Sequence, residues 1–185
     1  GRVVSVAQKE LRQAFPQPGW VEHDPVEIWH DQLAVARQAL SQSGRNAAEI
    51  AAIGITNQRE TAVLWERATG RPLHNALVWQ DRRTADACAK LKAEGAEAVI
   101  REKTGLVLDP YFSASKFGWI MENVELAKPL AGQGRLRLGT SDSYFLARLT
   151  RTFVAWNSPE LANPNVIFID GFYSGDMGAW SSAVP

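Results

Sequence analysis

IGITNQRET, at residues 53–61, is the stretch that decides the fold class, because an apolar run stops there at four polar residues and another strand follows at once. Residues 49–56 are almost entirely apolar, which predicts a strand buried on both faces of a sheet. Residues 61–66 predict a second strand. Polar side chains at the end of a strand in an α/β sheet commonly line a ligand crevice. The stretch therefore predicts a sheet with a candidate site at its edge.

Strands and helices alternate along most of the chain. Further strands are expected over residues 2–12, 75–80 and 136–138. Helices are expected over residues 84–94, 96–103 and 113–123, and over a last segment that runs through Leu149. Such alternation is typical of an α/β domain with a mixed β-sheet flanked by helices.

One helix has clear signals at both of its ends. Asp24 can accept hydrogen bonds from the first helical amides, and Pro25 suits the first helical position. Apolar residues then recur at steps of three and four over residues 26–40, which predicts one buried helix face. Gly44 is expected to end this helix.

The composition is that of a globular domain, and it argues against several classes of protein. The 185 residues are 45% hydrophobic and 22% charged, and 20 Lys plus Arg balance 20 Asp plus Glu. A formal net charge of zero argues against nucleic-acid binding, which needs a basic surplus, and leaves a neutral sugar or polyol open. No apolar run is long enough for a membrane span. Cys88 is the only cysteine, so no internal disulfide can form and a cytoplasmic location is expected.

Arg59 and Glu60 are the first candidate ligand-binding pair. Arg59 offers a planar fork of donors and Glu60 offers two acceptor oxygens, while each hydroxyl of a polyol both donates and accepts. Opposite charges side by side also neutralise each other in a partly dry site. The alternative is a solvated hairpin turn with an ordinary ion pair, and this segment taken alone favours that alternative.

Two aromatic residues extend the candidate site. Trp79 ends an apolar strand, and its indole could cover the carbon side of a polyol, whereas a core tryptophan is the alternative. Tyr111 follows a turn and could donate its phenol to a substrate oxygen, whereas a half-buried packing role is the alternative. Arg82 and Arg83 could hold an anion, but a solvated helix start is the favoured interpretation.

The remaining motifs carry less chemistry. GTSDSY at residues 139–144 is a strand-to-helix turn that could bind an anion, but capping by Ser141 or Asp142 is favoured. The three histidines lack metal-ligand spacing and there is no Cys/His cluster, so no metal site is expected. Neither a P-loop nor a dinucleotide fingerprint is present, and no cofactor-binding residue can be assigned.

Five segments, in this order and spacing, resemble glycerol kinases of the FGGY-type carbohydrate kinase family. They are FPQPGWVEHDP (15–25), IGITNQRET (53–61), NALVWQDRRT (75–84), TGLVLDPYFS (104–113) and GTSDSY (139–144). In that family the NQRET and VWQ segments are specific to the glycerol branch. The combination reverses the preference for the plainer interpretation of each segment.

The resemblance implies an actin-like, ribonuclease H-like fold and the transfer of the γ-phosphoryl group of ATP, with Mg²⁺, to a terminal hydroxyl of glycerol. Arg59, Glu60 and Tyr111 would bind the hydroxyls of glycerol, and Trp79 would pack against its carbon atoms. Catalysis of this type is mainly positioning and charge neutralisation. The complete enzyme is expected to be a homo-oligomer whose partner is glycerol, with no nucleic-acid or membrane partner.

The resemblance covers residues 1–150, as a partial N-terminal kinase domain, and residues 151–185 form a divergent tail. The family's phosphate loop would precede Gly1, and its catalytic base and adenosine-binding domain would follow Pro185. We therefore expect an incomplete domain with no catalytic residue in this chain. Two alternatives stay open: a kinase for another sugar or polyol of the same family, and an inactive fragment that at most binds a polyol.

Overall fold

The computed structural model describes residues 1–150 and 168–170, which form helices and short strands. The strands are β1 (Glu22–His23), β2 (Gly54–Thr56), β3 (Val63–Glu66), β4 (Ala76–Leu77), β5 (Leu136–Gly139) and β6 (Phe168–Asp170). The helices are α1 (Pro25–Ser43), the 3-10 turn η1 (Ala47–Glu49), α2 (Ala85–Ala93), α3 (Ala96–Thr104), α4 (Ser113–Asn123), α5 (Ala127–Gly132) and α6 (Ser141–Thr150). The expected tail, residues 151–185, lies outside the described residues except for the backbone of β6.

Short antiparallel pairings join four strands. β1 pairs with β4, with Glu22 opposite Leu77, and β3 pairs with β5, with Leu64 opposite Leu138. A bridge between Ala62 and Leu77 connects the two pairs. β2 pairs separately with β6 in the parallel orientation. Parallel and antiparallel pairs therefore both occur, as expected for a mixed sheet.

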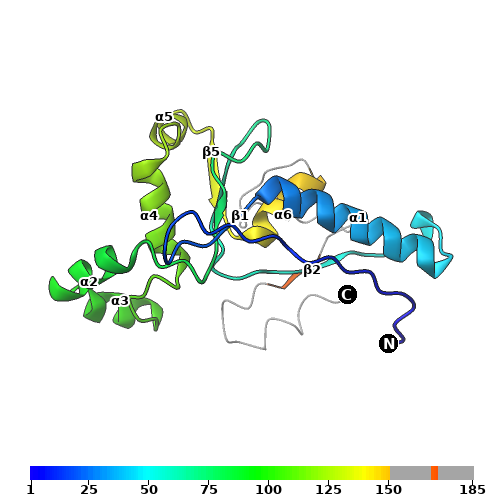
Figure 1. Cartoon of the computed structure of the whole chain (residues 1–185), viewed down its shortest axis with the longest axis horizontal. Helices are drawn as coiled ribbons and strands as arrows, with labels where there is room; N and C mark the ends of the chain where they lie inside the picture. The colour runs from blue at the N-terminus through cyan, green and yellow to red at the C-terminus, as the bar shows by residue number, and fades with distance from the viewer. Residues whose placement is uncertain (151–167, 171–185) are drawn as a thin grey trace.

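β3 is buried on both faces because helices cover each side of it (Figure 1). Leu64 belongs to one core cluster, together with Ile120 of α4 and Leu130 of α5. Trp65 points to the opposite face, since successive strand residues alternate, and packs in a second cluster with Tyr144 of α6. Helices thus cover both faces of the central strands, which is the layered arrangement of an α/β domain.

α1 begins and ends where the sequence predicts. Asp24 accepts hydrogen bonds from the amides of Val26 and Glu27 at 2.8 and 3.3 Å, and Gly44 follows the helix in the left-handed conformation with φ of 67°. The predicted apolar face is only partly covered, because α1 extends away from the other elements (Figure 1). The buried residues of α1 are Pro25, Ile28 and Asp31.

Residues 2–12 form no strand, contrary to the prediction. They run beside α1 (Figure 1), where Lys9 forms an ion pair with Asp31. The first ladder contact of the chain is the bridge between Ala14 and Glu22. Apolar alternation was misleading here because, among the described strands, none offers its backbone to residues 2–12.

The apolar run at residues 49–56 is also not the doubly buried strand that was predicted. β2 is limited to residues 54–56, of which Ile55 is half-buried and its two neighbours are exposed. β6 is the one strand that pairs with β2 within the described chain. Apolar side chains of this run therefore stay accessible, and Ile50 and Ile53 are 49% and 50% exposed.

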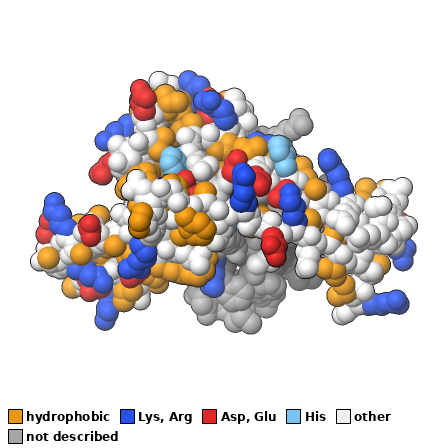
Figure 2. Space-filling view, viewed as in Figure 1, with side chains coloured by type: hydrophobic (Ala, Val, Ile, Leu, Met, Phe, Trp, Pro, Cys, Tyr) orange, Lys and Arg blue, Asp and Glu red, His pale blue; other side chains and the backbone are white. Residues whose placement is uncertain are grey.

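Charged side chains of both signs are distributed over the surface. On the face shown in Figure 2, basic and acidic side chains are interspersed, in keeping with the zero formal net charge of the chain. The exposed hydrophobic side chains include Leu91 of α2 and Val99 of α3. None of the described helices combines the length and the apolar character needed to cross a bilayer.

Candidate functional site

The polar turn after β2 joins the first turns of two helices. Asn57 accepts hydrogen bonds from the hydroxyl of Ser141 at 2.9 Å and from the amide of Asp142 at 3.3 Å, at the start of α6. Glu60, three residues later, accepts hydrogen bonds from Ser113, the first residue of α4. The turn is therefore an organised junction between β2, α4 and α6, and the alternative of a solvated hairpin turn is wrong. The side chain of Asn57 therefore occupies the N-terminal end of α6, which the sequence suggested as a possible anion site.

Glu60 is buried and has an unusual backbone conformation. Its φ is 62°, in the left-handed region, and it is the one non-glycine residue with positive φ among the described residues. The residue is 5% exposed, and its Oε2 atom accepts hydrogen bonds from the amide and the hydroxyl of Ser113 at 2.7 and 2.9 Å. A carboxylate is also stabilised by the dipole at the N-terminus of a helix. Strain of this kind persists where the surroundings fix it, and it is concentrated at functional sites.

Trp79 and Tyr111 come together from two different segments. Trp79 lies just after β4 and Tyr111 lies two residues before α4, and their ring centroids are 6.0 Å apart at an interplanar angle of 63°. Trp79 is 41% exposed and Tyr111 is 36% exposed, so the alternative of a core tryptophan is wrong. The pair offers accessible apolar surface next to a phenol hydroxyl, as a ligand with one apolar and one polar side requires.

Three of the four candidate residues are linked by contacts. Glu60 binds Ser113, which lies two residues after Tyr111, and Tyr111 touches Trp79. Arg59 precedes Glu60 in the same turn and is exposed. We call Arg59, Glu60, Trp79 and Tyr111 the four-residue cluster. Arg59 is included because it is the neighbour of Glu60 in the sequence.

Lys116 is a buried cation next to this cluster, and sequence reasoning missed it. Its Nζ donates hydrogen bonds to the carbonyl oxygens of Pro110, Tyr111 and Phe112. Lys116 is 0% exposed, and burial lowers its pKa to about 8 although the nearby carboxylate of Glu60 acts in the opposite direction. A single lysine in a helical segment carries no sequence signal of burial, because its partners are carbonyl groups of the preceding turn.

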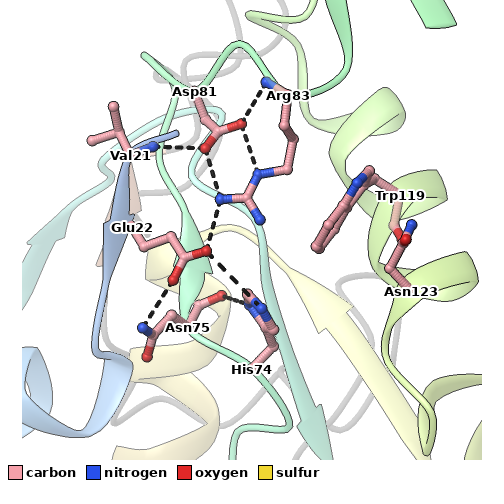
Figure 3. Close-up of polar contacts among 8 residues, drawn as sticks. All are labelled: Val21, Glu22, His74, Asn75, Asp81, Arg83, Trp119 and Asn123. Atoms are coloured by element: carbon pink, nitrogen blue, oxygen red, sulfur yellow. Dashed lines mark hydrogen bonds and ion pairs between the residues drawn. The ribbon is translucent and has the colours of Figure 1, made fainter. Parts of the chain in front are cut away.

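Arg83 is a second buried cation, although a solvated helix start was expected there. Its Nη2 donates to Glu22 at 2.7 Å and to Asp81 at 2.8 Å, and its Nε donates to Asp81 at 2.9 Å (Figure 3). Trp20 and Trp119 flank the guanidinium group, with ring centroids 3.8 and 4.5 Å from Cζ. The expectation is therefore wrong for Arg83, because two carboxylates and two indole rings take the place of water.

Asp81 connects the segment after β4 to the segment before β1. It accepts hydrogen bonds from the amides of Val21 at 2.7 Å and of Arg83 at 2.9 Å, in addition to those from the Arg83 side chain (Figure 3). Arg83 in turn reaches Glu22 of β1. This network fixes the segment that carries Trp79, which lies two residues before Asp81.

The sequence of this chain is similar to those of several known proteins. The N-terminal domain of the FGGY family of carbohydrate kinases matches residues 1–158. A glycerol kinase of Methylibium petroleiphilum is 53% identical over 181 residues, which cover 98% of this chain and 35% of that protein. A glycerol kinase of Paraburkholderia phymatum is 59% identical over 151 residues, which cover 82% of this chain and 30% of that protein. The chain thus spans about a third of the length of these curated relatives.

A solved structure shows the same fold. The crystal structure of Plasmodium falciparum glycerol kinase with ADP matches with a TM-score of 0.71 at 34% sequence identity. The match covers 77% of this chain and 29% of that chain. The likeness confirms the predicted fold class, an incomplete α/β domain of the sugar-kinase type.

Proposed function

The chain belongs to the FGGY family of carbohydrate kinases, and we propose that it carries the glycerol-binding part of a kinase that transfers a phosphoryl group from ATP to glycerol. The observation that carries this proposal is the contact between the rings of Trp79 and Tyr111. Ser113, two residues after Tyr111, donates a hydrogen bond to Glu60 and so links this carboxylate to the same turn. The two curated relatives named glycerol kinase support the choice of glycerol among carbohydrate substrates.

Each member of the four-residue cluster has a proposed role. Arg59 donates hydrogen bonds to glycerol hydroxyls and Glu60 accepts them. The phenol of Tyr111 adds a polar contact, and the indole of Trp79 covers the carbon side of the triol. Because Ser113 already holds the Glu60 carboxylate, less ordering is needed when glycerol binds. The chain's contribution to phosphoryl transfer is then the positioning of the acceptor hydroxyl.

ATP and Mg²⁺ belong to the proposed reaction. Among the described residues, no three His, Cys, Asp or Glu side chains gather in one place. Because Mg²⁺ that acts with ATP is held by one or two carboxylates together with phosphates, this finding assigns no Mg²⁺ ligand. ATP would supply the phosphoryl group, and no residue of this chain is assigned to the nucleotide, the metal or the catalytic base. A cytoplasmic location and a homo-oligomeric complete enzyme remain predictions.

We also propose that the kinase part of this chain ends near residue 150 and that residues 151–185 are a divergent tail, whose pairing of β6 with β2 is not needed for the kinase part to fold. The match to one relative covers 82% of this chain, which leaves part of the chain unmatched, whereas the match to another covers 98%. If the tail contributes little to folding, a chain of residues 1–150 should unfold at the same temperature as the full chain. A clearly lower unfolding temperature would assign the tail to the same folding unit.

An exchange with the Methylibium petroleiphilum enzyme tests the glycerol proposal. Residues 1–150 of this chain would replace the matching residues of that kinase, and ADP production would be measured with glycerol, with a pentose and with no acceptor. Glycerol-dependent ADP production that exceeds the pentose rate is expected. A higher rate with the pentose would favour a kinase for another sugar, and a folded but inactive chimera would favour an inactive fragment.

A further inference from the structure

We propose that Lys116 is a positioning residue for the glycerol site, and that it acts on Tyr111 through the backbone of the turn that carries this tyrosine. The inference rests on the proposed function, since it gives Lys116 a role in the same site. Lys116 is 0% exposed, so it acts through other residues and does not itself touch the substrate.

The ammonium group of Lys116 binds three successive carbonyl groups. Its Nζ donates to the oxygens of Pro110 at 2.7 Å, Tyr111 at 2.6 Å and Phe112 at 3.4 Å. An ammonium group has three donors and no acceptor, so these three oxygens use its whole capacity. Three convergent carbonyls from consecutive residues also define the path of the backbone, because each must point toward the same nitrogen atom.

Lys116 occupies a position where an apolar residue would suit the fold better. It lies on the buried face of α4 together with Ser113 and Ile120. It also lies in the first turn of the helix, where the dipole disfavours a cation, and an ammonium group is costly to remove from water. A residue that breaks several local rules marks a site where its chemistry is needed, and binding three carbonyls is what an apolar side chain cannot do.

The turn that Lys116 holds connects the parts of the four-residue cluster. Tyr111 packs against Trp79 in this turn, and Ser113 at its end donates two hydrogen bonds to Glu60. Without the ammonium group, the carbonyls of Pro110 and Tyr111 would lose this donor, whereas that of Phe112 would keep a hydrogen bond from the hydroxyl of Ser115 at 3.3 Å. The turn would then have to move for the freed carbonyls to find water. The ring of Tyr111 and the amide of Ser113 would move with it, so both walls of the glycerol site depend on Lys116.

The charge of Lys116 adds a pH signature. Burial lowers the pKa of Lys116 to about 8, and four titratable groups face it and act in the opposite direction: Glu60, Asp81, Asp109 and Cys88. Above this pH the neutral amine has two donors for three carbonyls, so the turn loosens and the KM for glycerol rises.

The effect of this titration on the stability of the fold has the opposite sign. The unfolded lysine keeps its proton to higher pH, so this group favours folding more as the pH rises above about 8.

Lys116→Met tests the role, and Lys128→Met is the matched control because Lys128 is exposed on α5. In the full 185-residue chain, the nuclear Overhauser effect between the rings of Trp79 and Tyr111 should be lost in Lys116→Met and kept in Lys128→Met. The nuclear Overhauser effects within the core cluster around Trp65 should remain in both variants. In the unmodified chain, the contact between Trp79 and Tyr111 should weaken as the pH rises through about 8.

Kinetics in the exchange chimera separate positioning from stability. Lys116→Met should raise the KM for glycerol about tenfold or more, the size expected when hydrogen bonds to a charged group are lost, and should leave kcat within about threefold. A purely structural role would lower kcat through a smaller folded fraction and leave KM unchanged. The KM of Lys116→Met should not change between pH 7 and 9, whereas Cys88→Ala should keep the pH dependence of the parent.

Two results would overturn the inference. One is a ring contact between Trp79 and Tyr111 that persists in Lys116→Met, or above pH 8 in the unmodified chain, with an unchanged KM. The other is a lower kcat at unchanged KM, which would assign Lys116 to global stability alone. An inactive parent chimera would refute the proposed function instead, and the ring contact would still decide whether Lys116 positions Tyr111.

Discussion

Arg82 and Arg83 are neighbours in the sequence, but only one of them is buried. The side chain of Arg82 is 57% exposed, and its Nη1 lies 3.4 Å from Asp109. The side chain of Arg83 is 0% exposed, between Glu22 and Asp81. An exposed ion pair contributes little because water competes for both charges, whereas removing one partner of a buried pair leaves the others unpaired in a dry environment.

Substituting the two arginines should therefore have unequal effects. Arg83→Met should lower the free energy of unfolding of the chain by about 3–5 kcal/mol, because Glu22 and Asp81 would stay buried without their cation. Arg82→Met should lower it by less than about 1 kcal/mol. Urea unfolding followed by tryptophan fluorescence measures both values. Equal losses in the two variants would show that Arg83 is not buried as described.

Arg59 is exposed, so its substitution should affect substrate use and leave the fold intact. Arg59→Ala in the exchange chimera should weaken kcat/KM for glycerol by about 1.5–3 kcal/mol, the range for hydrogen bonds to charged groups. Arg101→Ala, an exposed arginine on α3, is the matched control and should change nothing. An unchanged KM and turnover in Arg59→Ala would remove Arg59 from the site.

The sequence predicted part of the site and missed the residues that support it. Trp79 and Tyr111 were selected together on a family resemblance, and the structure places their rings in contact. Lys116 was missed, and Arg83 was expected to be solvated, because the burial of a cation depends on acceptors that other residues supply. For Arg83 these acceptors include Glu22, which lies 61 residues earlier in the chain.

Helices were easier to predict than strands in this chain. The expected helix at residues 113–123 has the bounds of α4, and α1 follows the signals of Asp24 and Gly44, because caps and helical spacing are local properties. Strands need partners from distant segments. Within the part of the chain that the structure describes, residues 2–12 have no strand partner, and residues 49–56 have one only at β2, which pairs with β6. Predictions of strands were therefore wrong in the segments where the described residues form few ladder contacts.

The N-terminal cap of α1 gives a prediction about a single helix. Asp24→Ala should lower the free energy of unfolding by about 1 kcal/mol, because the amides of Val26 and Glu27 lose their acceptor. Asp24→Ser keeps a capping oxygen and should lose much less. Urea unfolding measures the difference, and an equal loss in both variants would mean that the side chain of Asp24 does not cap the helix.

The molecule as a whole is organised around the junction after β2. Helices cover both faces of β3, and the turn at residues 57–60 binds the first turns of α4 and α6, which lie in different core clusters (Figure 1). Trp79 enters from the segment that Asp81 and Arg83 hold. The whole fold is therefore needed to bring the four-residue cluster together, although the chain spans about a third of its relatives' length.

Titration of the isotope-labelled chain with glycerol, followed by nuclear magnetic resonance, tests the central claim most directly. Glycerol should shift the signals of Arg59, Glu60, Trp79 and Tyr111 together, along one saturation curve. Arg59→Ala should raise the glycerol concentration at which this curve reaches half saturation. Signals of the core residues around Trp65 should not move. Shifts that are absent, or that occur away from these four residues, would contradict the assignment of a glycerol site.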